Sequence, residues 1–283
     1  MRWADLDLLG HVDNVVYVDY LQEARVDLFR VHAPDSRAED LAEGVVVVRH
    51  AVTYAAPLTF HFRPVSIECW VTEIRGASFT MAYEVFDDTS GERVVHLRAT
   101  TVLTPYVFGA ERPRRIRPEE REVLERFSEV PSAPTRRASP PHSTSHGTRL
   151  DEDGHYEVRV RFSDVDVYGH VNNVKYFEYF SESRISLVAR LTSEAPEARD
   201  LRMVVAQTDV DYKMPILFRP EPYDCWSRIT HLGRTSMTIE SEICDADRLL
   251  SRARVVAVWF DPETQRPAEP PRELRAVLET KSA

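Results

Sequence analysis

The sequence predicts an α+β fold in two tandem copies, each with one long central helix wrapped by a curved antiparallel sheet. Three observations predict it: a helix-length segment that occurs twice, alternating strands after each copy, and a chain length that suits two cores. With 283 residues, 43% of them hydrophobic, the chain can bury two cores of about 130 residues each. We expect domains at 1–127 and 155–283, joined by a proline- and serine-rich linker at 128–154.

The repeat is the strongest of these observations. Residues 2–28 align without a gap on residues 161–187, and 13 of the 27 positions are identical. Unrelated segments of this length share about two. The similarity continues downstream, which makes the repeated unit a whole domain: VTYAAPL at 52–58 matches VDYKMPI at 210–216, and IECWVTEI at 67–74 matches YDCWSRIT at 223–230.

The repeated segment predicts a long helix in each domain. We expect the side-chain acceptors of Asn14 and Asn173 to cap the first turns. The predicted buried face recurs at i, i+3, i+4, i+7 and i+11 in both copies, through Tyr17, Tyr20, Leu21, Ala24 and Leu28 in the first and Tyr176, Tyr179, Phe180, Ser183 and Leu187 in the second.

Strands are predicted after each helix. Apolar residues alternate with polar ones from Val65 to Thr72, and residues 78–87 and 93–104 continue the pattern. Tyr156–Phe162 is the predicted lead-in strand of the second domain. The sequence starts at Met1, so most of the equivalent strand is missing from the first domain, and we expect either a truncated strand or a misassigned start codon.

Composition excludes several classes of protein. The longest apolar runs, such as Val45–Val48, fall far short of the roughly 20 residues that span a bilayer, and no signal peptide core is present, so we expect a soluble, cytoplasmic protein. A net charge of −10 without an extended basic run argues against a nucleic-acid partner. Cys69, Cys225 and Cys244 lack the spacing of a metal site, so we expect no metal and no cofactor.

The strings DLDLLGHVDNVVYVDYL at 5–21 and DVDVYGHVNNVKYFEYF at 164–180 resemble the hotdog thioesterase superfamily, which includes 4-hydroxybenzoyl-CoA-type and plant acyl-ACP thioesterases. The resemblance covers roughly residues 1–110 and 155–262. It implies that the two domains pair as an internal pseudo-dimer, with sites between them, and leaves open a further homo-oligomer. It also implies that the C-terminal helix, around 272–279, packs on the outside.

The resemblance also implies a catalytic set. The second aspartate of each DxD pair matches the catalytic aspartate of the hydroxybenzoyl-CoA enzymes, and the HVNNVKY stretch matches the plant histidine. The catalytic candidates are Asp7, Asp166, His11, His170, Asn14 and Asn173, and the substrate-binding candidates are Gly10, Gly169, Tyr17 and Tyr176.

These residue types suit hydrolysis of an acyl-CoA, or of an acyl-ACP, to a free acid and a thiol. A carboxylate can deprotonate water or attack the thioester carbonyl, and free N–H groups at a helix N-terminus can stabilise the oxyanion. The tyrosines on the helix could line an acyl tunnel. The arginines at 114–121, Arg63 or Arg219 could meet the phosphates of coenzyme A.

Other interpretations stay open. The chain could be a non-catalytic acyl-CoA-binding module, or a hotdog hydratase or dehydratase, although the Asn-Pro-Leu-His setting of the latter is not seen. The aspartates could be turn residues and the histidines could simply bind backbone. The second domain could act alone, since Asp13 stands where it has Asn172.

Overall fold

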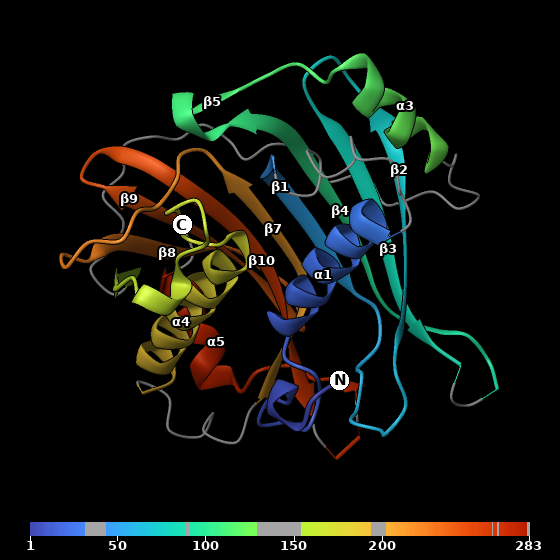
Figure 1. Ribbon diagram of the computed structural model, residues 1–283. Coiled ribbons are helices and arrows are strands. Elements are labelled where there is room, and N and C mark those ends of the chain that lie inside the picture. Colours follow the sequence, from blue (N-terminus) through green and yellow to red (C-terminus); the bar gives the residue numbers. More distant parts are fainter. Residues whose placement is uncertain are drawn as a thin grey trace. The chain divides into compact units, whose positions relative to one another are not determined.

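The computed structural model describes residues 1–31, 44–88, 91–128, 154–193, 202–261, 263–264 and 266–281. The chain divides into two compact units, Met1–Ser139 and Pro140–Ala283. In each unit one long helix lies against an antiparallel sheet that curves around it (Figure 1). The predicted α+β class and the two hotdog domains are therefore confirmed. Nearly all of the predicted linker lies outside the described residues.

The first unit has the sheet order β2-β3-β4-β1, and the short β5 pairs with β4. All of its ladders are antiparallel. Its elements, with 3₁₀ helices labelled η, are η1 (Trp3–Asp5), α1 (Val16–Val31), β1 (Val45–Tyr54), β2 (Ser66–Ile74), β3 (Phe79–Asp87), β4 (Val94–Val107), η2 (Phe108–Ala110), β5 (Arg112–Pro113) and α3 (Pro118–Arg126).

The second unit repeats this plan with the order β6-β8-β9-β10-β7, and β11 pairs with β10. The predicted lead-in strand is shorter than expected, because after four residues the chain leaves the sheet and forms a 3₁₀ turn. The elements are β6 (His155–Val158), η4 (Phe162–Asp164), α4 (Asn173–Ser193), β7 (Arg202–Tyr212), β8 (Tyr223–Leu232), β9 (Ser236–Asp245), β10 (Arg248–Asp261), β11 (Arg266–Pro267) and α5 (Arg272–Lys281).

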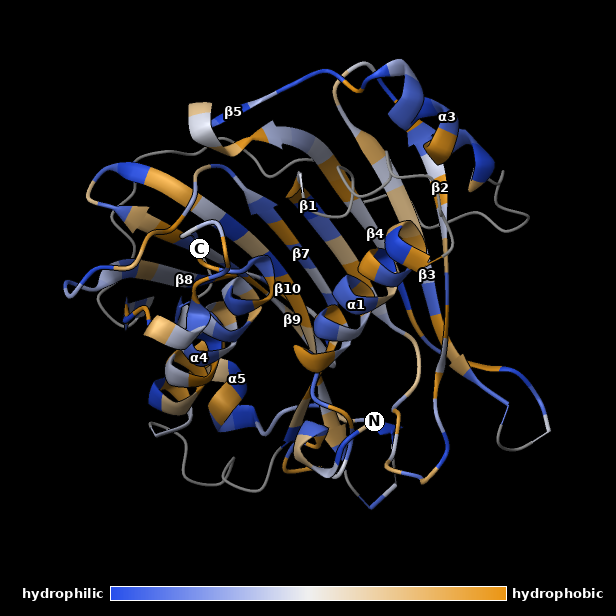
Figure 2. Ribbon diagram, viewed as in Figure 1, coloured by the Kyte–Doolittle hydropathy of each residue, from blue (hydrophilic) through white to orange (hydrophobic). Residues whose placement is uncertain are grey.

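Both long helices bury the face that the repeat predicts. Of the predicted positions, Tyr17, Leu21 and Leu28 of α1 are buried and the other two are half-buried, whereas all five of α4 are buried. Their outer faces are polar, so orange and blue residues alternate along each helix in Figure 2. None of the described helices is long and apolar enough to cross a membrane.

Contacts between strand and helix correct the sequence match of one strand position. By sequence, Cys69 matches Cys225. In the structure Cys69 Sγ lies 3.9 Å from the carbonyl oxygen of Ala24 on α1, and Ser227 Oγ lies 2.8 Å from Ser183 Oγ on α4. Ala24 and Ser183 are the same position of the helix repeat, so Ser227 is the counterpart of Cys69. A shift of two residues leaves the alternation of a strand unchanged, which is why the pattern could not reveal it.

The C-terminal helix α5 forms part of the core of the second unit. The resemblance implied an outer position, but Leu274 and Leu278 are buried in a cluster with Leu187 and Leu191 of α4 and with Trp259 of β10. The fourth-residue spacing of the two leucines places them on one face of α5. In the first unit α3 packs similarly against β2, burying Val123 and Leu124.

We expect Leu278→Ala to destabilise the second unit by about 2–5 kcal/mol, because it empties a closed core site. Urea unfolding followed by fluorescence measures this. Glu273→Ala, on the exposed face of the same helix, is the control and should stay within about 0.5 kcal/mol of the parent. Equal effects of the two substitutions would show that α5 is only loosely attached.

Candidate functional site

The second aspartate of each DxD pair begins a tight loop that ends at the histidine. The amide of Asp7 donates to the carbonyl oxygen of His11 at 2.7 Å, and Asp166 and His170 repeat this contact at 2.8 Å. The chain can reverse so sharply because Gly10 lies in the left-handed region with φ of 75°, as does Gly169 with 82°. The candidate aspartate and histidine therefore begin and end one loop in both units.

Each loop leaves one carboxylate oxygen open. Asp7 Oδ1 accepts hydrogen bonds from the amides of Leu9 and His11 at 2.8 and 3.0 Å. Asp166 Oδ1 accepts from the amides of Tyr168 and His170 at 2.9 and 3.3 Å. Within the described part of the chain, no polar group is seen against the second oxygen of either carboxylate. Each aspartate is half-buried, with one oxygen fixed and one available for chemistry.

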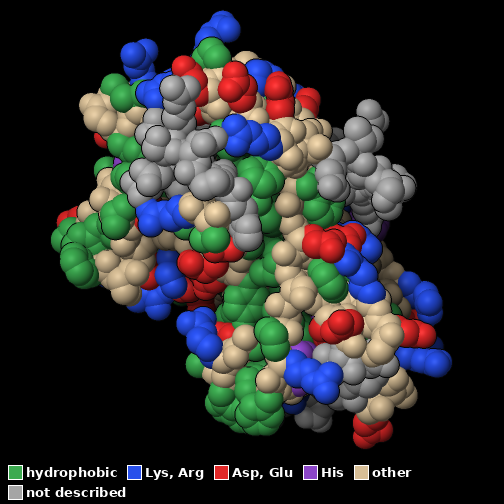
Figure 3. Space-filling view, turned by 45° about the vertical axis from the view of Figure 1, so that its right-hand side comes forward, with side chains coloured by type: hydrophobic (Ala, Val, Ile, Leu, Met, Phe, Trp, Pro, Cys, Tyr) green, Lys and Arg blue, Asp and Glu red, His purple; other side chains and the backbone are tan. Residues whose placement is uncertain are grey.

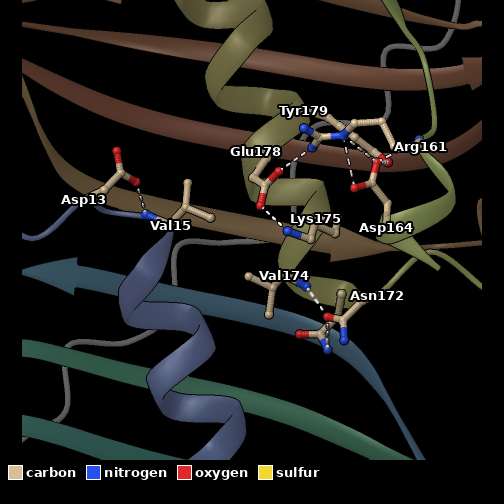
Figure 4. A network of polar contacts seen from close by, with 10 residues as sticks. Asp13, Val15, Arg161, Asp164, Asn172, Val174, Lys175, Glu178 and Tyr179 are labelled. Atoms are coloured by element: carbon tan, nitrogen blue, oxygen red, sulfur yellow. Dashed lines mark hydrogen bonds and ion pairs between the residues drawn. The ribbon is translucent and has the colours of Figure 1, made fainter. Parts of the chain in front are cut away.

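The first aspartate of each pair has a structural role. Asp164 is buried and accepts from the Tyr179 hydroxyl of α4 at 2.7 Å and from the Arg161 amide at 2.9 Å. The Arg161 guanidinium adds an ion pair at 3.2 Å and reaches on to Glu178 (Figure 4). Burial alone raises the pKa of the Asp164 carboxyl, but these hydrogen bonds and the arginine charge hold it below its ordinary value.

The first unit has the same anchor. Asp5 is buried, accepts from the Tyr20 hydroxyl and from the Arg2 side chain, and its pKa is again lowered despite the opposing effect of burial. The carbonyl of Asp5 also accepts from the amide of Asp13, so the anchor ties the loop to the start of α1. Sequence analysis missed this role, although the repeated spacing of aspartate and tyrosine was a signal for it.

The helix caps lie one residue earlier than predicted. We expected the acceptors of Asn14 and Asn173, but Asp13 Oδ1 accepts from the Val15 amide at 2.8 Å, and Asn172 Oδ1 accepts from the Val174 amide at 2.9 Å (Figure 4). The error arises because the carbonyls of Asp5 and Asp164 bind the amides of Asp13 and Asn172, which places these residues in the capping position. A charged side chain therefore caps the turn that leads into α1, whereas a neutral one caps α4.

A second segment flanks each loop. The carbonyl of Leu58 accepts from the Val12 amide at 2.8 Å, and Thr59 pairs with His11. In the second unit Ile216 and Leu217 make the same contacts with Val171 and His170.

Tyr17 and Tyr176 hold this flanking segment. Both are buried, and the Tyr176 hydroxyl accepts from the Ile216 amide at 2.9 Å. Burial raises the pKa of both phenols, so they stay protonated. They position the flanking segment against the loop. Direct contact of either ring with a substrate stays a prediction, as do the substrate-binding roles of Gly10 and Gly169.

The basic stretch at 114–121 serves the fold. Arg114 binds Glu120, which is buried at the start of α3, at 2.8 and 2.6 Å. Burial alone would raise the pKa of Glu120, but hydrogen bonds from Arg114 and the Arg117 amide hold it below its ordinary value. Arg219 binds Asp245 at 2.7 Å. Arg114 and Arg219 therefore have internal partners, and contact of the other arginines with the phosphates of coenzyme A stays a prediction.

The cysteines are poorly placed for nucleophilic chemistry. Burial raises the pKa of the Cys69 and Cys244 thiols to about 11 and that of the Cys225 thiol to about 12. Among the residues with assigned positions, no group of three His, Cys, Asp or Glu side chains is arranged to hold a metal ion.

In each unit an exposed aromatic residue before the loop meets one that follows the flanking segment. Trp3, which is 75% exposed, meets the Phe60 ring edge-on at 5.5 Å. Phe162, 84% exposed, meets Phe218 in the same way at 6.1 Å. On the face drawn in Figure 3, hydrophobic side chains reach the surface in patches between charged ones. The sequence analysis did not single out these pairs.

Comparison with known proteins places this geometry in a family. The model of the Thioesterase-like superfamily matches residues 1–132 and 160–278. The acyl-CoA thioester hydrolase YbgC of Escherichia coli O6:H1 is 26% identical over 43% of this chain and 92% of its own length. The long-chain acyl-CoA thioesterase FadM of Escherichia coli K12 is 27% identical over 44% and 95%. The protein YsmA of Bacillus subtilis is 35% identical over 29% of this chain, a match that spans 55% of YsmA.

Solved structures match over nearly the whole chain. The 12:0-ACP thioesterase of Umbellularia californica superposes with a TM-score of 0.68 at 18% identity and covers 95% of both chains. An acyl-ACP thioesterase of Bacteroides thetaiotaomicron gives 0.61 at 14% identity, over 90% and 93%. At these identities the likeness is one of fold.

We expect Asp164→Asn to destabilise the second unit by about 1–3 kcal/mol near neutral pH, because the charged acceptor of Arg161 and Tyr179 is lost. The folded pKa of Asp164 is lowered, so its contribution is present at neutral pH and disappears as pH falls through that pKa. Urea unfolding of the variant and parent should therefore converge in acid. Asp247→Asn, at an exposed turn, is the control, and a pH-independent difference for Asp164→Asn would contradict the anchor.

Proposed function

Because the chain belongs to the thioesterase-like superfamily, we propose that it hydrolyses acyl thioesters of coenzyme A, with Asp7 and Asp166 as the catalytic carboxylates. One observation carries the proposal. Each aspartate has one oxygen fixed by two backbone amides and the other open, beside the beginning of a long helix. This arrangement orients a carboxylate without neutralising it.

The open oxygen can serve in two ways. As a general base it takes a proton from water, whose oxygen bonds to the thioester carbon to give a tetrahedral oxyanion. The oxyanion then collapses with cleavage of the C–S bond, and the departing thiolate takes up the proton. As a nucleophile it forms an acyl anhydride with departure of the thiolate, and water then cleaves the anhydride. Both routes pass through an oxyanion, which the positive end of the helix stabilises.

The neighbouring residues support the aspartate in this proposal. His11 and His170 each donate a backbone amide to the aspartate that precedes them, whatever their rings contribute. Asn14 and Asn173 lie at the start of the long helices, and we propose that they contact the thioester or the attacking water. Their catalytic roles remain part of the proposal.

The substrate follows from the relatives. YbgC and FadM carry names that specify acyl-CoA, and each aligns with this chain over more than nine-tenths of its own length. The two solved structures described above are acyl-ACP enzymes by name, but their likeness to this chain is one of fold. Acyl-CoA is therefore the proposed substrate. Acyl-ACP is the second candidate, and the same thiol-release assay tests it.

The second unit should be the faster site. Asp13 places a negative charge at the start of α1, where it disfavours an oxyanion, whereas the cap of α4 is the neutral Asn172. The two sites would share one mechanism and differ in rate.

We expect Asp166→Asn to remove most of the hydrolysis, and Asp7→Asn to remove a smaller part. The double variant should fall by about 10²–10⁴-fold, the usual worth of a general base, while keeping the fold. Release of free thiol from acyl-CoAs of increasing chain length measures this, with Asp247→Asn as the control.

Tight binding of acyl-CoA with no thiol release by the parent chain would instead identify a non-catalytic binding module. Hydration or dehydration of an enoyl or hydroxyacyl thioester, retained in the double variant, would place the chemistry elsewhere.

A further inference from the structure

A tyrosine at the end of one strand reaches the start of the long helix in each unit. Tyr54 is the last residue of β1, and its hydroxyl donates to the carbonyl oxygen of Asn14 at 2.8 Å. Tyr212 is the last residue of β7, and its hydroxyl donates to the carbonyl oxygen of Asn173, also at 2.8 Å. The two tyrosines occupy the same place in the repeated strings VTYAAPL and VDYKMPI. The mechanism proposed above uses neither of them.

Each tyrosine stands on a fixed part of the sheet. The amides of the two residues after Tyr54 both donate to the carbonyl oxygen of His96 on β4, at 2.8 and 3.3 Å. The amides of the two residues after Tyr212 donate in the same way to Leu250 on β10, at 2.9 and 3.0 Å, so His96 and Leu250 are matched positions. The end of each strand is therefore tied to its neighbour directly after the tyrosine, which makes the hydroxyl a donor with a fixed position.

A second tyrosine packs against each of these rings. Tyr17 meets Tyr54 edge-on with 5.8 Å between the ring centres, and Tyr176 meets Tyr212 in the same way at 4.9 Å. The Tyr176 hydroxyl holds the segment that flanks the loop, whereas the Tyr212 hydroxyl holds the start of α4. One aromatic pair therefore fixes two of the segments that border the candidate aspartate.

The hydrogen bond from the tyrosine orients the peptide group that follows the asparagine. In the first unit the carbonyl end of that peptide binds Tyr54, and its amide end, on Val15, binds Asp13 Oδ1 at 2.8 Å. In the second unit the Val174 amide binds Asn172 Oδ1 at 2.9 Å. Because a peptide group is planar, contacts at both ends set its orientation and restrict the ψ angle of the asparagine. The backbone in turn restricts the rotamers that the asparagine side chain can adopt.

The restraint matters more in the first unit. α4 begins at Asn173 itself, whereas α1 begins two residues after Asn14. The Val18 amide donates to the Val15 carbonyl at 2.9 Å, a contact of the 3₁₀ type. The Asn14 carbonyl thus lies outside the regular helix, and within the described residues the tyrosine hydroxyl is the partner seen for it.

We propose that Tyr54 and Tyr212 are positioning residues, each of which holds the candidate asparagine of its own unit through the backbone carbonyl. The tyrosine hydroxyls do not touch the substrate. They determine where the side chains of Asn14 and Asn173 meet the thioester or the attacking water. The effect on catalysis rests on the proposed function, whereas the restraint on the helix start does not.

Hydrogen exchange by NMR tests the restraint in the full chain without any substrate. Tyr54→Phe keeps the ring and removes only the hydroxyl. The Val15 amide should then exchange about five- to tenfold faster, the worth of one hydrogen bond, while the matched Val174 amide is unchanged. Tyr212→Phe should give the reverse pattern. Unchanged exchange at Val15 in Tyr54→Phe would overturn the proposal.

Turnover tests the effect on each candidate site separately. In the Asp166→Asn background the proposed function leaves the first site active. There Tyr54→Phe should lower kcat about 10- to 100-fold and leave KM within about twofold, because the misplaced group is needed in the transition state. Tyr212→Phe should have this effect in the Asp7→Asn background. The control in both backgrounds is Tyr106→Phe, at a half-buried tyrosine of β4, which should change neither constant.

A double-variant cycle separates positioning from a general loss of stability. Since Tyr54 acts through Asn14, Tyr54→Phe should lower kcat by less than about twofold in the Asn14→Ala protein. The full effect of Tyr54→Phe in that protein would overturn the proposal, as would a rise in KM at unchanged kcat. Absence of turnover in every protein, with the exchange result as expected, would count against the hydrolase and the role of the asparagines, but not against the restraint on the helix start.

Discussion

The candidate sites depend on a buried carboxylate at the first aspartate of each DxD pair. Taking Asp5 or Asp164 out of water costs several kcal/mol unless charged and neutral donors replace the lost hydration. The tyrosine of the long helix and the arginine before the loop supply those donors. Because the partners come from the long helix and from the residue before the 3₁₀ turn, one side chain ties these two segments together. The second aspartate can then remain half-open without the loop collapsing.

The two units keep this frame but differ in the polar groups around it. Asp13 in the first unit is charged, whereas the matching Asn172 in the second is neutral. His61 and His96 of the first unit correspond to Arg219 and Leu250 of the second. Besides Val123 and Leu124, α3 of the first unit buries Glu120 in an ion pair with Arg114, whereas α5 buries leucines. An ion pair and a hydrophobic cluster can fill the same volume at similar net stability. The fold is therefore retained while the electrostatics of each site changes.

Several features could be predicted because they depend on local spacing. The helix periodicity from Tyr17 to Leu28 and the alternation in β2 follow directly from side-chain geometry, and both elements are present. The loop from Asp7 to His11 was also accessible, since aspartate, glycine and histidine recur at one spacing in both copies. The prediction of the cap was wrong by one residue because Asn14 and Asp13 are both good acceptors. The contact of the Asp13 amide with the Asp5 carbonyl selects between them.

The sequence by itself determined the duplication, the α+β class, the long helices and the loop that carries each candidate aspartate. It could not determine that Ser227, and not Cys225, is the counterpart of Cys69 in the second unit, because a shift of two residues preserves the alternation of a strand. Nor could it bring Tyr54 to Asn14, or Tyr212 to Asn173, since each pair joins the end of a strand to the start of a helix. Tertiary structure decided these points, since strand register and contacts between distant segments depend on how complete elements pack, and no short-range spacing encodes that packing.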